Sequence, residues 1–260
     1  MGGRLIVYFH GVPGSAAEIA QFQDVAKAYG VRLVGFDRFA LAPGLTGDDY
    51  FRALAKQVDE LAAGEEVEVV GFSMGAFVAL RTVPFISTAV CRLHLISAAA
   101  PLECGYFLPQ MAGRPVFEMA MKSEVLLRRV GRAQGWVARW APGLLFRMLF
   151  GSAQGGDQAL ALDPEFRAMI NGALKYSLGP GLAGYVRDIS AYVQPWGEAL
   201  SQVKWETQIW HGELDNWSPS GMAKVLRSLL PEPSALEVVE SASHYSCLAA
   251  ALPRILAVAR

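Results

Sequence analysis

Ser73 stands two residues after Gly71 and two residues before Gly75, in the spacing Gly-x-Ser-x-Gly. The β-branched run 67–70 before this group predicts a buried strand, and the Ala/Val/Leu-rich stretch after it predicts a helix. Glycines at these positions let strand and helix approach closely, and the sharp turn between them exposes the serine hydroxyl at the end of the sheet. Such a serine can attack a carbonyl carbon if a base accepts its proton.

Four histidines are available as that base. His10 opens a glycine-containing loop, and His94 lies between leucines in an apolar strand, so both favour structural roles. His211 precedes an aspartate by only four positions on a tight loop, which favours a role in supporting that loop. His244 follows the last predicted strand, at the same end of the sheet as the serine. We therefore predict that His244 accepts the Ser73 proton.

An acid must hold the imidazole of the base in the correct tautomer. Asp215 lies on the loop after the strand that precedes the strand of the histidine, which is the position expected for this acid. Glu213 and Glu240 compete for the role, whereas Asp37 favours a structural one. The preferred acid falls between the serine and the histidine in the chain.

These residues must be positioned by the secondary structure around them. Helices are predicted between strands, which indicates a mostly parallel sheet covered by helices on both faces. The predicted strands cover 4–9, 31–36, 67–70, 91–97, 207–210 and 235–239, and the main predicted helices cover 16–29, 48–63, 220–230 and 247–259. In such sheets the ligand site lies beyond the carboxyl ends of the strands. The loop 10–14 and Ser73 both fall at those ends.

The alternation stops at residue 102. Between 102 and 204 there is no strand pattern, only helical stretches rich in Met, Trp, Phe and Arg and interrupted by Pro and Gly. We predict a core domain formed by 1–101 and 205–260, and a helical cap formed by 102–204 that lies over the site. The apolar stretch 136–150 contains Arg139 and Arg147 and could touch a membrane surface or a partner, but the pattern favours an ordinary lid helix.

Four motifs occur in a characteristic order: His-Gly-x-Pro-Gly at 10–14, Gly-x-Ser-x-Gly at 71–75, His-Gly-x-x-Asp at 211–215, and the terminal His244. With them the chain resembles the serine-nucleophile, esterase-like branch of the α/β-hydrolase superfamily over nearly its whole length. The resemblance implies catalytic roles for Ser73, Asp215 and His244. It also implies an oxyanion hole made by the backbone N–H groups of Met74 and Val12, which can lower the barrier by about 3 kcal/mol each.

The same resemblance places a helical lid after the sixth strand of the family fold. Relatives usually have two or more strands before the His-Gly-x-Pro strand, but here that strand begins at residue 4, so the N-terminal strands of the family are expected to be missing. The loop 37–44 also lacks the Asp-x-Arg-Gly-x-Gly-x-Ser form that is common in relatives. This loop borders the site in the family, so the substrate does not follow from the resemblance.

The expected activity is carboxylesterase-like hydrolysis of a small to medium, largely apolar acyl ester, thioester or lactone. Residues expected to line the substrate pocket are Gly11, Phe72, Met111, Trp136, Phe146, Trp217 and Tyr245. Carbon–carbon bond hydrolases and related lyases use the same triad and remain an alternative, for which Arg114, Arg128, Arg129 and Arg132 are candidate substrate-binding groups. A prolyl-type aminopeptidase would need acidic residues to hold a free amine, and the cap offers few obvious candidates. A small-ligand receptor of the same fold, with no or slow turnover, is the alternative outside enzymes.

Composition limits the other possibilities. The formal net charge is -1 and the basic residues are scattered, so no nucleic-acid partner is expected. No run of about 18 uncharged apolar residues exists, and the apolar run 5–9 is too short for a signal peptide. The three cysteines lack metal or redox spacing and favour thiols in a reducing compartment. We expect a cytoplasmic monomer or homodimer without stable membrane insertion, and the expected reaction needs no metal and no cofactor.

Overall fold

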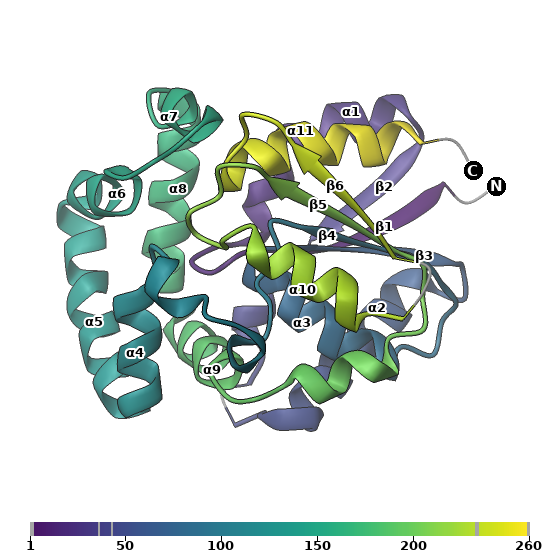
Figure 1. Cartoon of the computed structure of the whole chain (residues 1–260), viewed down its shortest axis with the longest axis horizontal. Helices are drawn as coiled ribbons and strands as arrows, with labels where there is room; N and C mark the ends of the chain where they lie inside the picture. The colour runs from purple at the N-terminus through teal and green to yellow at the C-terminus, as the bar shows by residue number, and fades with distance from the viewer. Residues whose placement is uncertain (1–2, 36, 43, 232–233, 259–260) are drawn as a thin grey trace.

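The computed structural model describes residues 3–35, 37–42, 44–231 and 234–258. Six strands form one sheet in the order β2-β1-β3-β4-β5-β6, and every neighbouring pair is parallel (Figure 1). Their bounds are β1 Arg4–Phe9, β2 Val31–Gly35, β3 Val67–Phe72, β4 Val90–Ile96, β5 Thr207–Gly212 and β6 Ser234–Val239. The expected parallel sheet is therefore confirmed.

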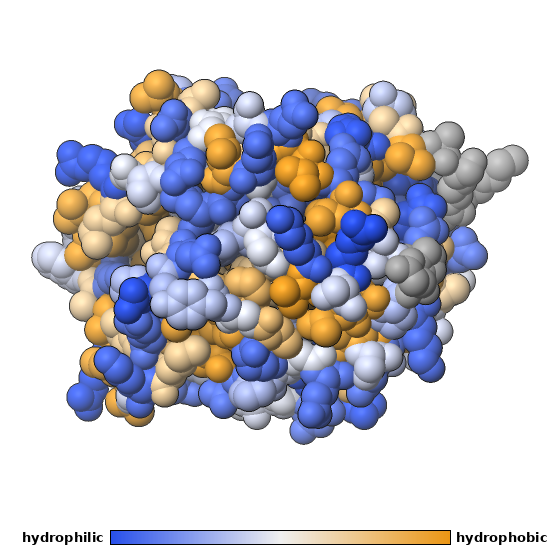
Figure 2. Space-filling view, viewed as in Figure 1, coloured by the Kyte–Doolittle hydropathy of each residue, from blue (hydrophilic) through white to orange (hydrophobic). Residues whose placement is uncertain are grey.

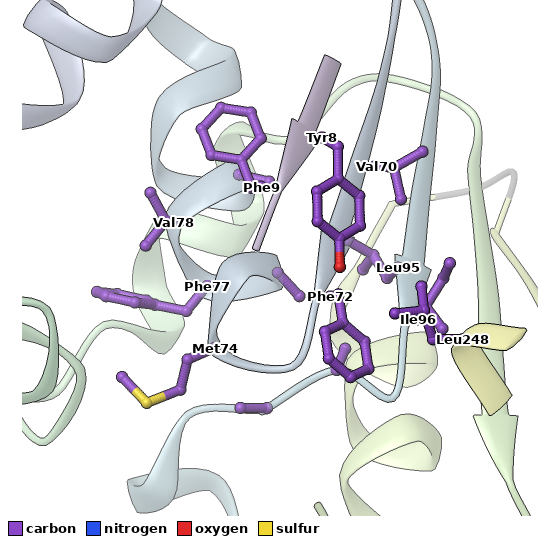
Figure 3. Packing of buried hydrophobic residues seen from close by; sticks show 14 of the residues in the cluster. Tyr8, Phe9, Val70, Phe72, Met74, Phe77, Val78, Leu95, Ile96 and Leu248 are labelled. Atoms are coloured by element: carbon purple, nitrogen blue, oxygen red, sulfur yellow. The ribbon is translucent and has the colours of Figure 1, made fainter. Parts of the chain in front are cut away.

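Helices cover both faces of this sheet (Figure 1). One face carries α1 (Gln23–Ala28) and α11 (His244–Ala257), and the other carries α2 (Gly47–Ala62), α3 (Met74–Thr82) and α10 (Gly221–Leu229). Because both faces are covered, every residue of β3 is buried, and the strand is apolar except for Glu68, which pairs with Arg4 and contacts His94. Figure 3 shows the packing around it, with Phe72 and Val70 beside Tyr8 of β1 and Leu95 of β4.

The predicted elements correspond closely to the observed ones, although several bounds differ; the helix expected from residue 247, for example, begins at His244. The helix expected over 16–29 is divided into a 3₁₀ segment, Ala16–Phe22, and α1, a combination that is common at the start of helices. The strands expected over 67–70 and 207–210 each continue for two further residues. Parts of the predicted elements and domains that fall on residues 1–2, 36, 43, 232–233 and 259–260 lie outside the described residues.

Residues 102–204, here called the helical segment, contain no strand, as expected; all of them are described. The segment's α-helices are α4 Arg114–Lys122, α5 Glu124–Trp140, α6 Pro142–Phe150, α7 Gly156–Leu160, α8 Pro164–Ser177 and α9 Leu182–Tyr192. Its 3₁₀ helices are Leu102–Cys104, Leu108–Gln110 and Gly197–Gln202. In Figure 1, α4 to α8 gather at one end of the molecule, beyond the carboxyl ends of the strands, and α9 lies beside them below the sheet.

Within the described residues, no helix combines the length and the apolar character needed to cross a bilayer. The division of the chain into two domains stays a prediction, as does the place of the helical segment relative to the sixth strand of the family fold. No strand precedes β1 in the part of the chain that the structure describes.

Candidate active site

Ser73 lies on the turn between β3 and α3, with φ 56° and ψ -127°. This backbone conformation is unfavourable for a residue with a side chain and is typical of a strained functional turn. A Cβ atom at Gly75 would lie 2.1 Å from the Phe9 carbonyl oxygen, and one at Gly71 would lie 2.6 Å from the Ala76 Cα. Neither position accepts a larger residue, so both glycines are needed for this turn.

Asp215, on the loop after β5, lies next to His244, the first residue of α11 after β6. His244 Nδ1 donates a hydrogen bond of 2.8 Å to Asp215 Oδ2, while Asp215 Oδ1 accepts from the backbone N–H groups of Trp217 (2.8 Å) and Ser218 (2.9 Å). With Nδ1 carrying the proton, His244 Nε2 is left with a free lone pair. This is the tautomer that a general base requires.

Burial of Asp215 disfavours its charged form, yet the adjacent His244 and the Ser218 N–H outweigh this effect and lower the pKa of the carboxyl below its usual value. The carboxylate therefore stays ionised at neutral pH. An ionised carboxylate at this position stabilises the imidazolium that forms when the histidine accepts a proton.

The serine and the histidine are linked through the strand ends. The Ser73 N–H donates to the Ile96 carbonyl oxygen (2.9 Å), and the Ser97 hydroxyl donates to the His244 carbonyl oxygen (3.1 Å). Both side chains are almost completely buried. No hydrogen bond between the Ser73 hydroxyl and the His244 ring is present among the described residues; such bonds often tighten only when substrate binds.

The other three histidines have partners that fit structural roles. His10 bonds a neighbouring carbonyl oxygen through Nδ1, His94 contacts Glu68 at 3.3 Å, and His211 bonds the Ser218 carbonyl oxygen at 2.8 Å. Burial lowers the pKa of each of these histidines, which favours the neutral ring.

The other acids considered also occupy positions that fit structural roles. Glu213 accepts a hydrogen bond of 3.1 Å from the Ser241 N–H, so it supports the loop before His244 rather than the imidazole. Glu240 is exposed, and Asp37 accepts from the Phe39 N–H at 3.1 Å.

Two backbone N–H groups beside Ser73 are available to a ligand. Neither the Val12 N–H nor the Met74 N–H donates a hydrogen bond to another described residue, and both residues line a cavity that Ser73 also lines. Unpaired donors at the edge of a cavity can stabilise a negatively charged oxygen. This geometry fits the oxyanion hole expected from the sequence.

The loop that contains Val12 is fixed by the side chains around it. The Gly11 N–H donates to Glu18 Oε2 (3.2 Å), which also accepts from the Tyr8 hydroxyl (2.8 Å). The Gly14 N–H donates to the hydroxyl of Ser177 on α8 (3.1 Å). Because Glu18 precedes the helical segment and Ser177 belongs to it, these hydrogen bonds make the position of the loop depend on both parts of the chain.

The cavity beside Ser73 has a volume of about 330 Å³. Its wall combines the turn of Ser73 and the loop of Val12 with residues from the helical segment: Met111, Ala112, Gly113, Pro115, Val116, Phe117, Gln134, Leu145, Met148, Leu149, Ser152, Leu174, Leu178, Tyr185 and Ile189. None of the described residues that line it is charged. The wall therefore suits an uncharged, largely apolar group.

Two of the seven predicted pocket residues, Met111 and Trp217, line this cavity. The Trp217 ring also stacks on the His244 ring, with centroids 5.2 Å apart. The prediction that Trp136 lines the pocket is wrong: its side chain is 70% exposed on the outer surface of α5 and is not part of the cavity wall. The opposite surface of α5 carries the buried Leu127, Gly131 and Ala138, so the helix turns Trp136 away from the core.

The remaining four predicted pocket residues, Gly11, Phe72, Phe146 and Tyr245, are not part of the cavity wall. The rings of Phe72 and His244 lie 4.9 Å apart, and the ring of Tyr245 contacts Phe72 at 5.2 Å. Phe146 stacks on Phe150 at 4.7 Å. These rings hold the residues that form the site and do not line the cavity itself.

Asp157, on α7, contacts the residues next to His244 and was not identified from the sequence. Its Oδ2 accepts from the Tyr245 N–H (3.1 Å), and its Oδ1 accepts from the Ser246 N–H (2.7 Å) and hydroxyl (2.6 Å). The side chain is 1% exposed. A carboxylate at these donors fixes the first turn of α11, where His244 is the first residue. Asp157 is therefore a positioning residue for the candidate base.

We expect Asp157→Asn to lower kcat by about 10- to 100-fold with little change in KM, because a small displacement of the base can cost this much. Asparagine has one acceptor oxygen, so it cannot satisfy donors on both sides of the carboxylate. Steady-state kinetics on an ester measure the effect. The matched control is Asp163→Asn, which alters the N-cap of α8 away from His244. Equal losses of kcat in Asp157→Asn and Asp163→Asn would contradict a positioning role for Asp157.

Arg38 ties the loop of residues 10–14 to the helical segment. Its guanidinium donates to Asp188 Oδ2 on α9 (2.7 Å) and to the carbonyl oxygens of His10 (2.6 Å) and Gly11 (3.3 Å). The side chains of this ion pair are 1% and 0% exposed. Sequence patterns gave no sign of this pair.

We expect Asp188→Ala to lower the free energy of unfolding by about 3–5 kcal/mol, because it leaves the buried Arg38 charge without its partner. Urea denaturation measures the change. Asp48→Ala removes the partner of Arg81 in an ion pair whose carboxylate is 58% exposed, and should cost less than about 1 kcal/mol. Similar losses in the two variants would contradict the importance of the buried pair.

The parallel sheet, the strained strand–serine–helix turn and the aspartate–histidine pair define the class of α/β hydrolases. The sequence model described as the alpha/beta hydrolase family matches residues 6–256, and the chain belongs to that family. Among the described residues, no group of three or more His, Cys, Asp or Glu side chains could hold a metal ion.

Solved structures of similar fold include two esterases and a bromoperoxidase. The esterase from Exiguobacterium antarcticum has a TM-score of 0.70 at 18% identity, covering 99% of this chain and 93% of its own. The thermophilic esterase from Thermogutta terrifontis has a TM-score of 0.69 at 18% identity, covering 98% and 88%. The bromoperoxidase from Bacillus anthracis has a TM-score of 0.68 at 19% identity, covering 98% and 90%. No curated protein matches the chain significantly in sequence.

Proposed function

We propose that this protein is a serine hydrolase of carboxylesterase type that acts on a small to medium, largely apolar acyl ester, thioester or lactone. The observation that carries the proposal is the His244–Asp215 hydrogen bond of 2.8 Å, next to an apolar cavity that Ser73 lines. Esterases among the solved structures of similar fold are consistent with it.

In the proposed mechanism, Ser73 Oγ attacks the acyl carbonyl carbon while His244 Nε2 accepts the hydroxyl proton. Asp215 holds the imidazole tautomer, and the N–H groups of Met74 and Val12 stabilise the negative oxygen of the tetrahedral intermediate. The protonated His244 then donates its proton to the leaving group. Water attacks the acyl-enzyme with His244 again as the base, and Ser73 is regenerated.

Carbon–carbon bond hydrolysis of acidic substrates is the weaker alternative. It would need basic side chains in the cavity, but Arg114 pairs with Glu118 and Arg128 pairs with Glu124, at 2.7 Å in both cases. Neither arginine is part of the cavity wall. A neutral acyl group fits this wall better than a carboxylate.

A chain-length series of chromogenic esters, run beside a carbon–carbon substrate and an aminoacyl amide, tests the proposal. We expect steady turnover of esters with the highest kcat/KM at an intermediate acyl length that fills the cavity. Turnover of only the carbon–carbon substrate or the amide would exclude an esterase. At most one slow turnover on every substrate would instead indicate a receptor.

A further inference from the structure

The outward surface of α5 and α6 is both basic and apolar. Between 125 and 150 the sequence contains five arginines and no acidic residue, although the net charge of the whole chain is -1. Arg128 pairs with Glu124. The other four, Arg129, Arg132, Arg139 and Arg147, form no ion pair with another described residue.

These arginines are interleaved with exposed apolar side chains. Positions 125, 129, 132, 136 and 139–140 follow the spacing of one side of a helix, and all of them are exposed. Trp136 is 70% exposed and Trp140 is 67% exposed, and on α6 Met148 is 68% exposed. We name this set, Val125, Arg129, Arg132, Trp136, Arg139, Trp140, Leu144, Arg147 and Met148, the basic-aromatic surface.

This arrangement is not explained by packing within the chain. Helix α5 directs Leu127, Gly131 and Ala138 inward, so the tryptophans and arginines are left on its outer side. The Arg139 guanidinium lies 5.4 Å from the centroid of the Trp140 ring. Figure 2 shows orange and pale apolar side chains among blue ones at this end of the molecule.

The basic-aromatic surface also continues into the cavity. Met148 belongs to both, because it is 68% exposed and also forms part of the cavity wall. Leu145 and Leu149, on the same helix, line the cavity as well. An apolar molecule that approaches the outer side of α6 could therefore pass along apolar side chains into the cavity beside Ser73.

We propose that the basic-aromatic surface docks peripherally on an anionic lipid bilayer. Unpaired arginines are attracted to anionic headgroups, and exposed Trp, Leu and Met side chains enter the boundary between headgroups and acyl chains. Trp is suited to this boundary because one end of its ring system is polar. Delivery of a lipid-soluble ester to the cavity rests in addition on the proposed hydrolase function, whereas the docking itself does not.

Co-sedimentation with lipid vesicles tests the docking. The protein should bind vesicles made of equal parts phosphatidylcholine and phosphatidylglycerol, should not bind pure phosphatidylcholine vesicles, and should be released by high salt. The variant R129Q/R132Q/R139Q/R147Q should bind the anionic vesicles about 100-fold more weakly. Trp136→Ser combined with Trp140→Ser should also weaken binding.

The matched control, K27Q/K56Q/K224Q/R227Q, instead removes four exposed cations from α1, α2 and α10, which lie outside the helical segment. It should bind like the unmodified protein. Unchanged circular dichroism and thermal unfolding, and unchanged turnover of a water-soluble short ester, show that the surface variants fold. If no ester is hydrolysed but the anionic vesicles are bound, the docking stands and the proposed function fails.

Three results would overturn the docking proposal. The first is no binding to anionic vesicles, and the second is an equal loss of binding in the core control. The third is that light scattering shows a dimer of the unmodified protein, that the surface variants are monomers, and that vesicles are not bound. The basic-aromatic surface would then be covered by a second copy of the chain.

Discussion

Replacement of Ser73 by alanine is expected to lower kcat/KM for the best ester by about 10⁴- to 10⁶-fold, the range over which loss of an activated serine nucleophile is measured. The reason is that the remaining groups can still bind and polarise the carbonyl but cannot form an acyl-enzyme. The folded state should persist, because no hydrogen bond that the structure records depends on the hydroxyl. Alanine also fits the space of the serine.

The measurement combines ester kinetics with a fluorophosphonate probe. The unmodified protein should be labelled at Ser73, and Ser73→Ala should not be labelled. Ser228→Ala, which removes an exposed hydroxyl on α10, is the control and should keep full labelling and activity. Folded protein that does not react with the probe, or that reacts at another serine, would sink the nucleophile assignment.

The sheet and the candidate catalytic residues could be predicted because they leave local signals. A buried parallel strand is rich in β-branched apolar residues, as at Val67, Val69 and Val70, and the turn after it demands glycines at fixed positions around Ser73. The choice of His244 and Asp215 followed from which loops lie at the carboxyl ends of the strands. The structure places these two side chains in direct contact.

The supporting contacts could not be predicted, because they join residues far apart in the chain. Asp157 bonds a residue 88 positions away, and Arg38 bonds one 150 positions away. Each is a charged side chain in a segment without periodic signal, so nothing local distinguishes it from an exposed charge. Burial in the folded chain is what makes these groups important.

For the helical segment, the prediction of which side chains face the cavity was partly wrong. Its helical character was correctly predicted, but the direction of each side chain depends on how the helices pack against one another. Trp136 was therefore assigned to the pocket although it lies outside, whereas Gln134, two residues earlier on α5, lines the cavity. The 3.6-residue period separates the two surfaces of a helix but does not state which one meets a ligand.

Asp215→Asn is expected to lower kcat by about 10⁴-fold while the fold is retained. Asparagine has one acceptor oxygen and one NH₂ donor. The oxygen would keep the bonds from the N–H groups of Trp217 and Ser218, so the NH₂ group would face His244 Nδ1. Nδ1 would then have to accept a hydrogen bond, the ring proton would move to Nε2, and His244 could no longer accept the Ser73 proton.

Kinetics of Asp215→Asn and Glu213→Gln on one ester separate this effect from general damage to the loop. Glu213→Gln keeps an acceptor for the Ser241 N–H, so its activity should change little. Asp215→Ala should lose stability as well as activity, because it leaves two backbone donors without a partner. A large loss in Glu213→Gln together with an active Asp215→Asn would move the acid to Glu213. The loss in Asp215→Asn alone, with normal unfolding, would place the effect on the tautomer of His244.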